Sequence, residues 1–470
     1  MSLINNRIIL IRFSLPQKRK HGHPYNRRPP LQIGYMISLL KKEYEIKFLD
    51  GWITNYSLNL LLKKTRDFNP VVAVMSFTAE ERQSALVYAT KIKELSSHIK
   101  IICIGPYAST LPQTLIFEKS PIDFVLMGEC EIDLVRALRN LNSTEELKKI
   151  RSLYFKEKPQ AEIALVEDLN RLPMPEHSFF NPKHYFSIYP LPLNLTLKWG
   201  YILSSRGCPH RCIFCSPVIR TSYGSKMRFR SAKSVVEEML YLKSAGVNII
   251  SFEDDNFTAS KEHILELCKE IVNKKVNLPW IAHGRVADLS NEIMFAMKKA
   301  GCVLLKIGVE SGSNRIIDIL SKTEEKIDWN KKTREVFEQS KKINLSLHAM
   351  FIIGNPQETE KDLNLTINLI NEIKPESIQI HYFVPYPGSI AFDRYCYNQK
   401  FNDALHHYNP SNIINLSEIN TKKLKKTQRY IYRTFYLKPP FLIKHFLKYW
   451  RFYLHNPRVA KEGIKGLIRI

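Results

Sequence analysis

Residues 204–216 read SSRGCPHRCIFCS and place Cys208, Cys212 and Cys215 within eight positions, in the spacing C-x3-C-x2-C. Three thiols this close together indicate a metal site. A structural zinc ion needs four ligands, usually two separated cysteine pairs, and the other five cysteines of the chain stand alone. His210 could complete a zinc site only in a strained loop. Three thiolates instead favour a 4Fe–4S cluster with one iron left open for a reacting ligand.

The cysteine loop follows the first of six strand-like segments that alternate with helical ones. Strands are predicted at 200–205, 248–253, 279–283, 303–309, 345–353 and 377–383, and helices at 231–245, 260–274, 290–300, 329–342 and 359–373. This alternation predicts a (β/α)6 partial TIM barrel over residues 196–395, with its site at the carboxyl ends of the strands. The three cysteines lie at that end.

An earlier alternation precedes the barrel. Short apolar strands at 7–13, 45–50, 70–77, 99–105 and 122–128 predict a parallel sheet covered by helices, a Rossmann-like α/β domain over residues 1–145. The segment 146–195 is rich in proline and aromatic residues and is predicted to be a linker. Residues 396–470 lack strand patterns and are predicted to form a basic helical region that docks on the barrel or lies on a membrane surface.

The composition is that of a globular protein, with 44% hydrophobic residues and a net charge of +25. From Glu418 to Ile470 there are 14 Lys and Arg against two acids, a charge of +12. This patch could attract anionic lipid, nucleic acid or an acidic substrate, or be a solvated surface only. Eight cysteines, no signal peptide pattern and no apolar run of about 18 residues lead us to expect a cytoplasmic protein.

Taken with its place after the first barrel strand, SSRGCPHRCIFCS resembles the signature of the radical S-adenosylmethionine (SAM) superfamily. The resemblance implies that Cys208, Cys212 and Cys215 bind a 4Fe–4S cluster whose fourth iron is chelated by SAM. Reductive cleavage of SAM would then give methionine and a 5′-deoxyadenosyl radical, which removes a hydrogen atom from an unactivated carbon.

Acids at the ends of later strands fit the same resemblance. FEDDNFT (252–258) would direct Glu253, Asp254 and Asp255 to the SAM amino group, although such acids also cap helices. Arg285 follows the third strand and could bind a substrate or cofactor anion, or pair with nearby acids.

Two further motifs continue the likeness along the barrel. In AGCVLLKIGVESGSNRI (300–316), Glu310 and Ser311 would reach the ribose or carboxylate of SAM. MFIIGNPQET (350–359) resembles the pattern G-x-P-G-E-T with Gln357 at the usual glycine, which leaves the shape of that turn open.

The N-terminal domain resembles the cobalamin-dependent class of radical SAM enzymes through PPLQIGYMISLL (29–40), IGPYAST (104–110) and DFVLMGECE (123–131). The resemblance implies a bound cobalamin without a protein histidine on cobalt. Ile104 and Tyr107 replace a usual glycine and histidine, and could narrow the cobalamin seat. The candidates for lining it, which could otherwise be plain turn residues, are Ser76, Thr78, Gly105, Pro106, Gly128 and Glu129.

The class implies a methyltransferase in which one SAM methylates cobalamin and a second generates the radical. The expected substrate is a small molecule or lipid, and the expected reductant is an electron donor such as flavodoxin or ferredoxin. Nucleic acid is not expected as a partner, and the basic tail allows peripheral membrane contact.

Three alternatives stay open. The first is a cyclase or rearrangement enzyme of the same class without net methyl transfer. The second is a tRNA methylthiotransferase, a group that typically adds three N-terminal clustered cysteines and a C-terminal β-barrel, neither of which this sequence suggests. The third is a non-catalytic cobalamin- or cluster-binding module.

Overall fold

The computed structural model describes residues 6–13, 27–54, 56–78, 81–215, 224–323, 327–386, 388–396 and 414–469. The chain forms two compact units. Unit 1 comprises Met1–Lys20, Pro29–His184 and Ser216–Arg228, and unit 2 comprises His21–Arg28, Tyr185–Cys215 and Phe229–Ile470. Across the described residues, no helix is both long and apolar enough to cross a bilayer.

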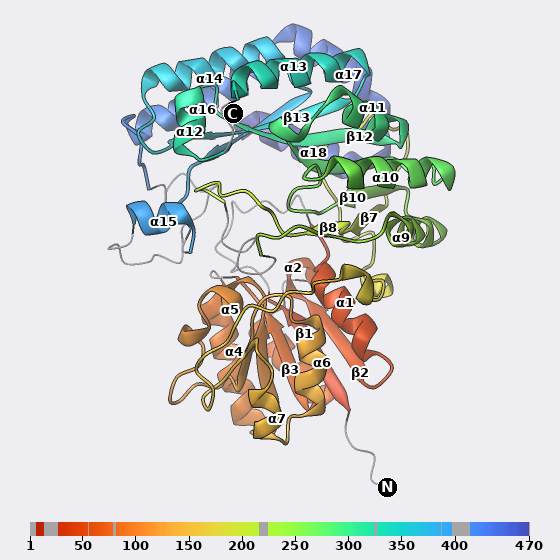
Figure 1. Cartoon of the computed structure of the whole chain (residues 1–470), viewed down its shortest axis with the longest axis vertical. Coiled ribbons are helices and arrows are strands. Elements are labelled where there is room, and N and C mark those ends of the chain that lie inside the picture. The colour runs from red at the N-terminus through yellow and green to blue at the C-terminus, as the bar shows by residue number, and fades with distance from the viewer. Residues whose placement is uncertain are drawn as a thin grey trace. The chain divides into compact units, whose positions relative to one another are not determined.

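Unit 1 contains a six-stranded sheet in the order β2-β1-β3-β4-β5-β6 (Figure 1). The strands are β1 Arg7–Arg12, β2 Glu45–Asp50, β3 Val72–Ser76, β4 Lys100–Ile104, β5 Phe124–Leu126 and β6 Leu153–Tyr154. The helices are α1 Leu31–Leu40, α2 Gly51–Thr54, α3 Leu58–Phe68, α4 Arg82–Leu95, α5 Pro106–Thr110, α6 Glu131–Arg139 and α7 Thr144–Lys148, with 3-10 turns at Pro112–Thr114, Leu169–Arg171 and His177–Phe179.

Both faces of this sheet are buried, as the unbroken apolar strands predict. Ile9 and Ile11 of β1 pack into the cluster that includes α4, and Ile8 and Leu10 pack into the cluster that includes α1 and α6. The alternation of side chains along each strand divides the residues between the two cores. The Rossmann-like α/β prediction is therefore confirmed.

The segment 146–195, predicted to be a linker, contributes a strand to this sheet. Leu153 and Tyr154 form β6, which pairs antiparallel with β5, and residues up to His184 are counted with unit 1. The apolar Leu153 is fully buried, which explains why these residues join the sheet.

Unit 2 contains six parallel strands in the order β14-β13-β12-β11-β10-β7. They are β7 Trp199–Ile202, β10 Ile249–Phe252, β11 Trp280–Arg285, β12 Cys302–Glu310, β13 Ser346–Ile353 and β14 Ser377–Tyr382, with short strands β8 Ser205–Arg206 and β9 Arg228–Phe229 beside them in the sequence. The intervening helices are α9 Ala232–Ser244, α10 Lys261–Asn273, α11 Asn291–Lys299, α12 Asn314–Ile319, α13 Trp329–Lys342, α14 Glu360–Ile373 and α15 Ile390–Tyr395, with a 3-10 turn at Val286–Asp288.

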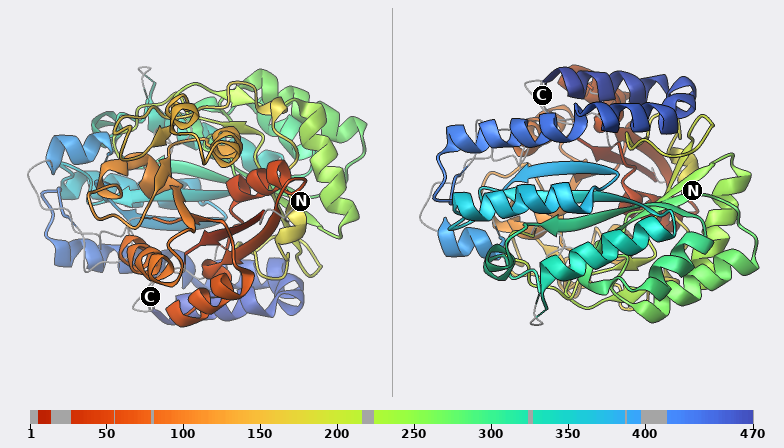
Figure 2. Two further views of the ribbon diagram at one scale, coloured as in Figure 1. Left: turned by 90° about the horizontal axis from the view of Figure 1, so that it is seen from below. Right: turned by 90° about the horizontal axis from the view of Figure 1, so that it is seen from above.

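The helices of unit 2 cover one face of its sheet, as Figure 2 shows from two sides. Alternate strand residues such as Ala282, Leu305, Ile307 and Ala349 pack under them in one hydrophobic cluster. The residues between these positions point to the opposite, inner face. The predicted (β/α)6 partial barrel is confirmed.

The C-terminal region is helical, as predicted, with α16 Thr421–Tyr436, α17 Pro439–His455 and α18 Pro457–Arg469. Helix α16 docks on the edge strand β14. The Tyr436 hydroxyl accepts a hydrogen bond from the Ile378 amide at 2.8 Å and donates to the Ile378 carbonyl at 2.9 Å. Tyr432 accepts from the Ile380 amide at 2.9 Å. Side chains of α16 thus satisfy backbone groups that a further strand would otherwise pair.

We expect Tyr436→Phe to lower the free energy of unfolding by about 1–3 kcal/mol, because a buried amide and carbonyl would lose their partner. Tyr430→Phe is the matched control, since Tyr430 lies on the same helix and is 56% exposed. Urea unfolding of the full chain measures both variants. An equal effect of the two substitutions would contradict this account of the β14 edge.

Candidate functional site

The cysteine loop is anchored at its middle by backbone contacts of Ile213. The Ile213 amide donates to the carbonyl of Leu320 at 3.0 Å, and the Ile213 carbonyl accepts from the amide of Ala391 at 3.0 Å. The Ile213 side chain is 1% exposed and packs with Leu320, Ala391 and Phe383. The loop between the cysteines is therefore attached to the regions after β12 and β14.

The three thiols lie close enough to influence one another. Burial, followed by the neighbouring Cys212 and Cys208, raises the pKa of Cys215 to about 12. Burial is also the main cause that raises the pKa of Cys208. A metal must therefore draw the protons from these thiols on binding. Within the described residues no three His, Cys, Asp or Glu side chains are close enough for one metal ion. That the three thiols bind a cluster stays a prediction.

Asp254 is an organising residue for the segment that leads into the cysteine loop. Its Oδ1 atom accepts hydrogen bonds from the Ser204 hydroxyl at 2.8 Å, the Ser204 amide at 3.0 Å and the Ser205 hydroxyl at 2.6 Å. The residue is 2% exposed, and burial raises its pKa to about 6. Its bonds hold residues 204 and 205, immediately before the cysteines.

The two acids beside Asp254 point elsewhere. Glu253 forms an ion pair with Arg28 at 2.5 Å and accepts from the Ser251 hydroxyl at 2.5 Å. Asp255 lies near the thiols, since its charge contributes to raising the pKa of Cys208 and Cys215. The sequence placed all three acids at SAM, and in the structure Asp255 is the one associated with the thiols.

Glu310 ends β12 in a left-handed conformation, with a φ of 66°. Its carboxylate pairs with Lys322 at 2.6 Å, and both side chains are at least nine-tenths buried. A Cβ at Gly308 would lie 2.3 Å from Glu310 Oε1, so glycine makes room for this pair. The Lys322 ammonium also lies 5.4 Å from the ring centroid of Phe214 in the cysteine loop.

The sequence analysis missed Lys322. Neither spacing nor periodicity marks a lysine twelve residues after the glutamate with which it pairs. Strain at a non-glycine residue such as Glu310 is common at functional sites, where surrounding contacts maintain it.

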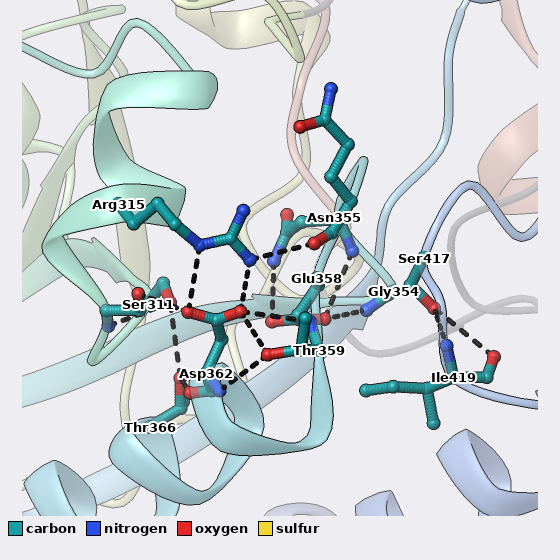
Figure 3. A network of polar contacts seen from close by, with 12 residues as sticks. Ser311, Arg315, Gly354, Asn355, Glu358, Thr359, Asp362, Thr366, Ser417 and Ile419 are labelled. Carbon is teal, nitrogen blue, oxygen red and sulfur yellow. Dashed lines mark hydrogen bonds and ion pairs between the residues drawn. The ribbon is translucent and has the colours of Figure 1, made fainter.

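Ser311 is fully buried in the turn after Glu310, where its hydroxyl contacts the Thr366 hydroxyl at 3.2 Å and accepts from the Ser313 amide at 3.1 Å. Asp362 accepts from the Ser313 hydroxyl at 2.6 Å and forms an ion pair with Arg315 (Figure 3). These contacts attach the β12 turn to α14. The predicted role of Ser311 toward SAM stays a prediction.

The β13 turn is built around Glu358. Its carboxylate accepts from the Gly354 amide at 2.6 Å and from the Asn355 side chain at 3.1 Å, as Figure 3 shows. Burial raises the pKa of Glu358 to about 7. Gln357 adopts a φ of 59°, the left-handed region that favours glycine. The chain therefore keeps a glycine-like backbone at this position despite the glutamine.

Arg285 is 9% exposed at the end of β11. Its guanidinium donates to the carbonyl of Lys322, lies 3.5 Å from Asp288 and faces the ring of Trp329. Of the predicted alternatives, the structure shows the pairing with a nearby acid.

Five of the six first-unit candidates follow strand ends at one edge of the sheet. Ser76 ends β3 and Thr78 follows it, Gly105 and Pro106 follow β4, and Gly128 follows β5. Gly105 has a φ of 89°, and a Cβ there would lie 2.7 Å from the Ser76 hydroxyl oxygen. This edge is where ligands bind in doubly wound sheets.

Glu129 has a different environment. It is 2% exposed and forms a two-point ion pair with Arg228 at 2.5 and 2.7 Å, while accepting from the Val166 amide at 2.8 Å. Arg228 was not identified from the sequence. Tyr107, which was expected to narrow the cobalamin site, packs into the hydrophobic core of unit 1 and is 7% exposed.

Comparisons with known proteins agree with this architecture. Residues 202–370 match the model of the radical SAM superfamily. An uncharacterized methyltransferase of Pyrococcus horikoshii is 26% identical over 94% of both chains. Cytidylyl-2-hydroxyethylphosphonate methyltransferase of Streptomyces wedmorensis is 24% identical over 80% of this chain and 79% of its own.

Among solved structures, the radical SAM methyltransferase TsrM from Kitasatospora setae, with tryptophan substrate and a SAM analogue bound, matches with a TM-score of 0.67 at 15% identity. The match covers 84% of this chain and 77% of TsrM. The cobalamin-dependent SAM radical enzyme OxsB matches with a TM-score of 0.62 at 17% identity, over 78% of this chain and 52% of OxsB.

The cysteine loop, the barrel and the family model together define a radical SAM enzyme, in which residues 202–370 form the radical SAM domain. The chain has the fold of cobalamin-dependent radical SAM enzymes, and several of its relatives carry methyltransferase names.

We expect Asp254→Asn to weaken iron binding about 10-fold or more, the range seen when a residue that orients metal ligands is lost. The amide would place a donor against the serine donors at 204 and 205. Iron per chain after anaerobic reconstitution at limiting iron measures the effect. Glu266→Gln, an exposed acid on α10, is the control. Full iron loading of Asp254→Asn would contradict the organising role.

Proposed function

We propose that this chain is a cobalamin-dependent radical SAM methyltransferase that methylates an unactivated carbon of a small-molecule or lipid substrate. The observation that carries the proposal is the three-thiol loop, fixed by Asp254 and Ile213 at the carboxyl end of the barrel sheet, on the same chain as a Rossmann-like sheet with glycine turns at its strand ends. Relatives named as methyltransferases and TsrM-like architecture support it.

In the proposed enzyme, separate residues of unit 2 would contact the cluster and SAM. Cys208, Cys212 and Cys215 would hold a 4Fe–4S cluster, and Asp255 and Glu310 would contact SAM from the neighbouring strand ends. When bound, the cluster supplies the electron for SAM cleavage and cobalamin supplies the methyl group. Lys322 holds the Glu310 carboxylate in its buried position through their ion pair at 2.6 Å.

In unit 1, we propose that the strand-end edge with Ser76, Thr78, Gly105, Pro106 and Gly128 lines the cobalamin. Glycines allow close approach of a ligand to the backbone there. Glu129 takes a positioning role instead, because its carboxylate is engaged by Arg228 and the Val166 amide. Cobalamin absorbance retained after gel filtration would test the assignment.

A cyclase of the same class is the second candidate. The anaerobic magnesium-protoporphyrin IX monomethyl ester cyclase of Cereibacter sphaeroides is 24% identical over 77% of this chain and 60% of its own. Product analysis with SAM labelled in its methyl group separates the two: label in the product indicates methylation, and an unlabelled cyclised product indicates the alternative.

We expect replacement of Cys208, Cys212 or Cys215 by alanine to abolish reductive SAM cleavage, because a cluster that loses one of three ligands is not held. Formation of 5′-deoxyadenosine with dithionite as reductant measures the loss. Cys268→Ala, at a buried cysteine of α10, is the matched control and should retain activity. Turnover by any of the three loop variants would falsify the cluster assignment.

We further propose a cytoplasmic location, supported by eight cysteines that are all free, and an electron donor such as flavodoxin or ferredoxin.

For the C-terminal helical region, we propose contact with an anionic membrane surface. Ile443, Phe446, Leu447 and Leu454 are 62–72% exposed along one stripe of α17, a helix without a single acid. Lys444, Lys448 and Arg451 of the same helix lie beside the stripe, and Lys448 also pairs with Glu376. An apolar stripe with neighbouring cations is typical of interfacial helices.

We expect the chain to sediment with phosphatidylglycerol vesicles and less with phosphatidylcholine vesicles. Phe446→Ser should weaken this binding about 10-fold, since burying a phenylalanine contributes about 1.5–3 kcal/mol. Phe295→Ser is the matched control, because Phe295 on α11 is 61% exposed and Phe446 is 65% exposed. Equal sedimentation of both variants would exclude α17 as the contact.

A further inference from the structure

The inner face of the second sheet carries a row of titratable side chains that the proposed chemistry does not use. His283 of β11, Lys306 of β12 and His348 of β13 occupy matched positions on three adjacent strands. Residues in register on parallel strands point to the same face. The neighbouring Leu305 and Ile307 pack beneath the helices, which places this row on the opposite, inner face.

Lys306 is the unusual member of the row. It is 1% exposed, and none of the residues described by the structure forms a hydrogen bond or an ion pair with its ammonium group. The ammonium nitrogen lies over the ring of Tyr189, 5.4 Å from its centroid. Burial of an ammonium without a counter-ion carries a cost of several kcal/mol, so this lysine is not explained by stability.

The nearest carboxylate does not neutralise Lys306. Glu253 contributes to the electrostatic environment of Lys306, but its oxygens are engaged by Arg28 at 2.5 Å and by Ser251 at 2.5 Å. Burial, together with Arg28, lowers the pKa of Lys306 to about 7. Around Lys306 the neighbouring charges are therefore two cations, Lys306 and Arg28, against the one carboxylate of Glu253.

The histidines of the row are suited to hydrogen bonding rather than to charge. Burial is the main cause that lowers the pKa of His348 to about 3, and burial and Lys306 hold the pKa of His283 well below its usual value. Both rings are therefore neutral near pH 7. The Nδ1 atom of His348 contacts the Ser377 hydroxyl at 2.7 Å, which fixes the orientation of its ring.

We infer that Lys306 anchors an anionic oxygen group of the substrate, a carboxylate or a phosphoryl group, on the inner face of the second sheet. An incoming anion would supply the missing counter-charge, and the flanking histidines would orient it. Tyr189 belongs to a loop rather than to the sheet, and its ring also contacts the ring of His348, with 5.0 Å between the two centroids. The inference rests on the proposed function, because it names the substrate class of the same barrel.

The test compares Lys306→Met with Lys299→Met, an exposed lysine at the end of α11. The melting temperature of the full-length protein is measured against methylphosphonate and against acetate, with chloride holding the ionic strength constant. A ligand that binds the folded state raises the melting temperature saturably. We expect this rise in wild type and Lys299→Met, and a half-saturation concentration at least 10-fold higher in Lys306→Met. A preference for methylphosphonate assigns a phosphoryl group, and one for acetate a carboxylate.

A second readout separates a binding role from a structural one. Without added anion, Lys306→Met should melt at or above the wild-type temperature, because the substitution removes a buried unpaired charge of similar volume. A lower melting temperature, or anion responses that are equal in wild type and Lys306→Met, would overturn the inference. The melting temperature does not depend on SAM cleavage. The outcome of this experiment is therefore independent of the outcome of the cysteine experiment, which tests the proposed function.

Discussion

The loops after β10, β12 and β13 each close around a buried carboxylate. A carboxylate taken out of water needs donors or a counter-charge, and without them its ionised form is strongly destabilised. Asp254 meets this need with two serines, Glu310 with Lys322, and Glu358 with the amide of Gly354 and the side chain of Asn355. In each case the donor comes from another loop or from the turn itself, so the acid fixes the path of the backbone.

This constraint explains how an irregular loop can carry precise chemistry. From Gly207 to Cys215 the cysteine segment has no helix or strand, and it has no acid of its own. Its start is held through the serines that donate to Asp254, and its middle through the backbone of Ile213. The left-handed residues Glu310 and Gln357 lie in the adjoining turns, where such a conformation costs about 1 kcal/mol or more and persists because neighbouring contacts impose it.

The strands, the helices and the cysteine loop could be predicted from the sequence because their signals are local: apolar runs, helical periodicity and a fixed thiol spacing. Partnerships between distant residues could not. Nothing near Glu129 indicates Arg228, which is 99 positions away, and nothing near β14 indicates that tyrosine hydroxyls of α16 meet its edge. The three acids at 253–255 were recognised from the sequence, but their separate environments depend on tertiary packing. Glu253 pairs with Arg28, Asp254 accepts from two serines, and Asp255 lies near the thiols. The strand β6, within the segment predicted to be a linker, was not foreseen for the same reason, since it forms only against β5.

The hydroxyl contacts along β14 have a consequence for self-association. An uncovered border strand offers a ladder of amides and carbonyls on which a strand of a second molecule can assemble. Here Tyr432 and Tyr436 occupy that ladder at Ile380 and Ile378, and a hydroxyl can both give and receive a proton, so it imitates a missing strand without extending the ladder further. The tyrosines of α16 therefore block strand addition from a second molecule at β14. This effect is separate from any role of the exposed surface of the C-terminal helices.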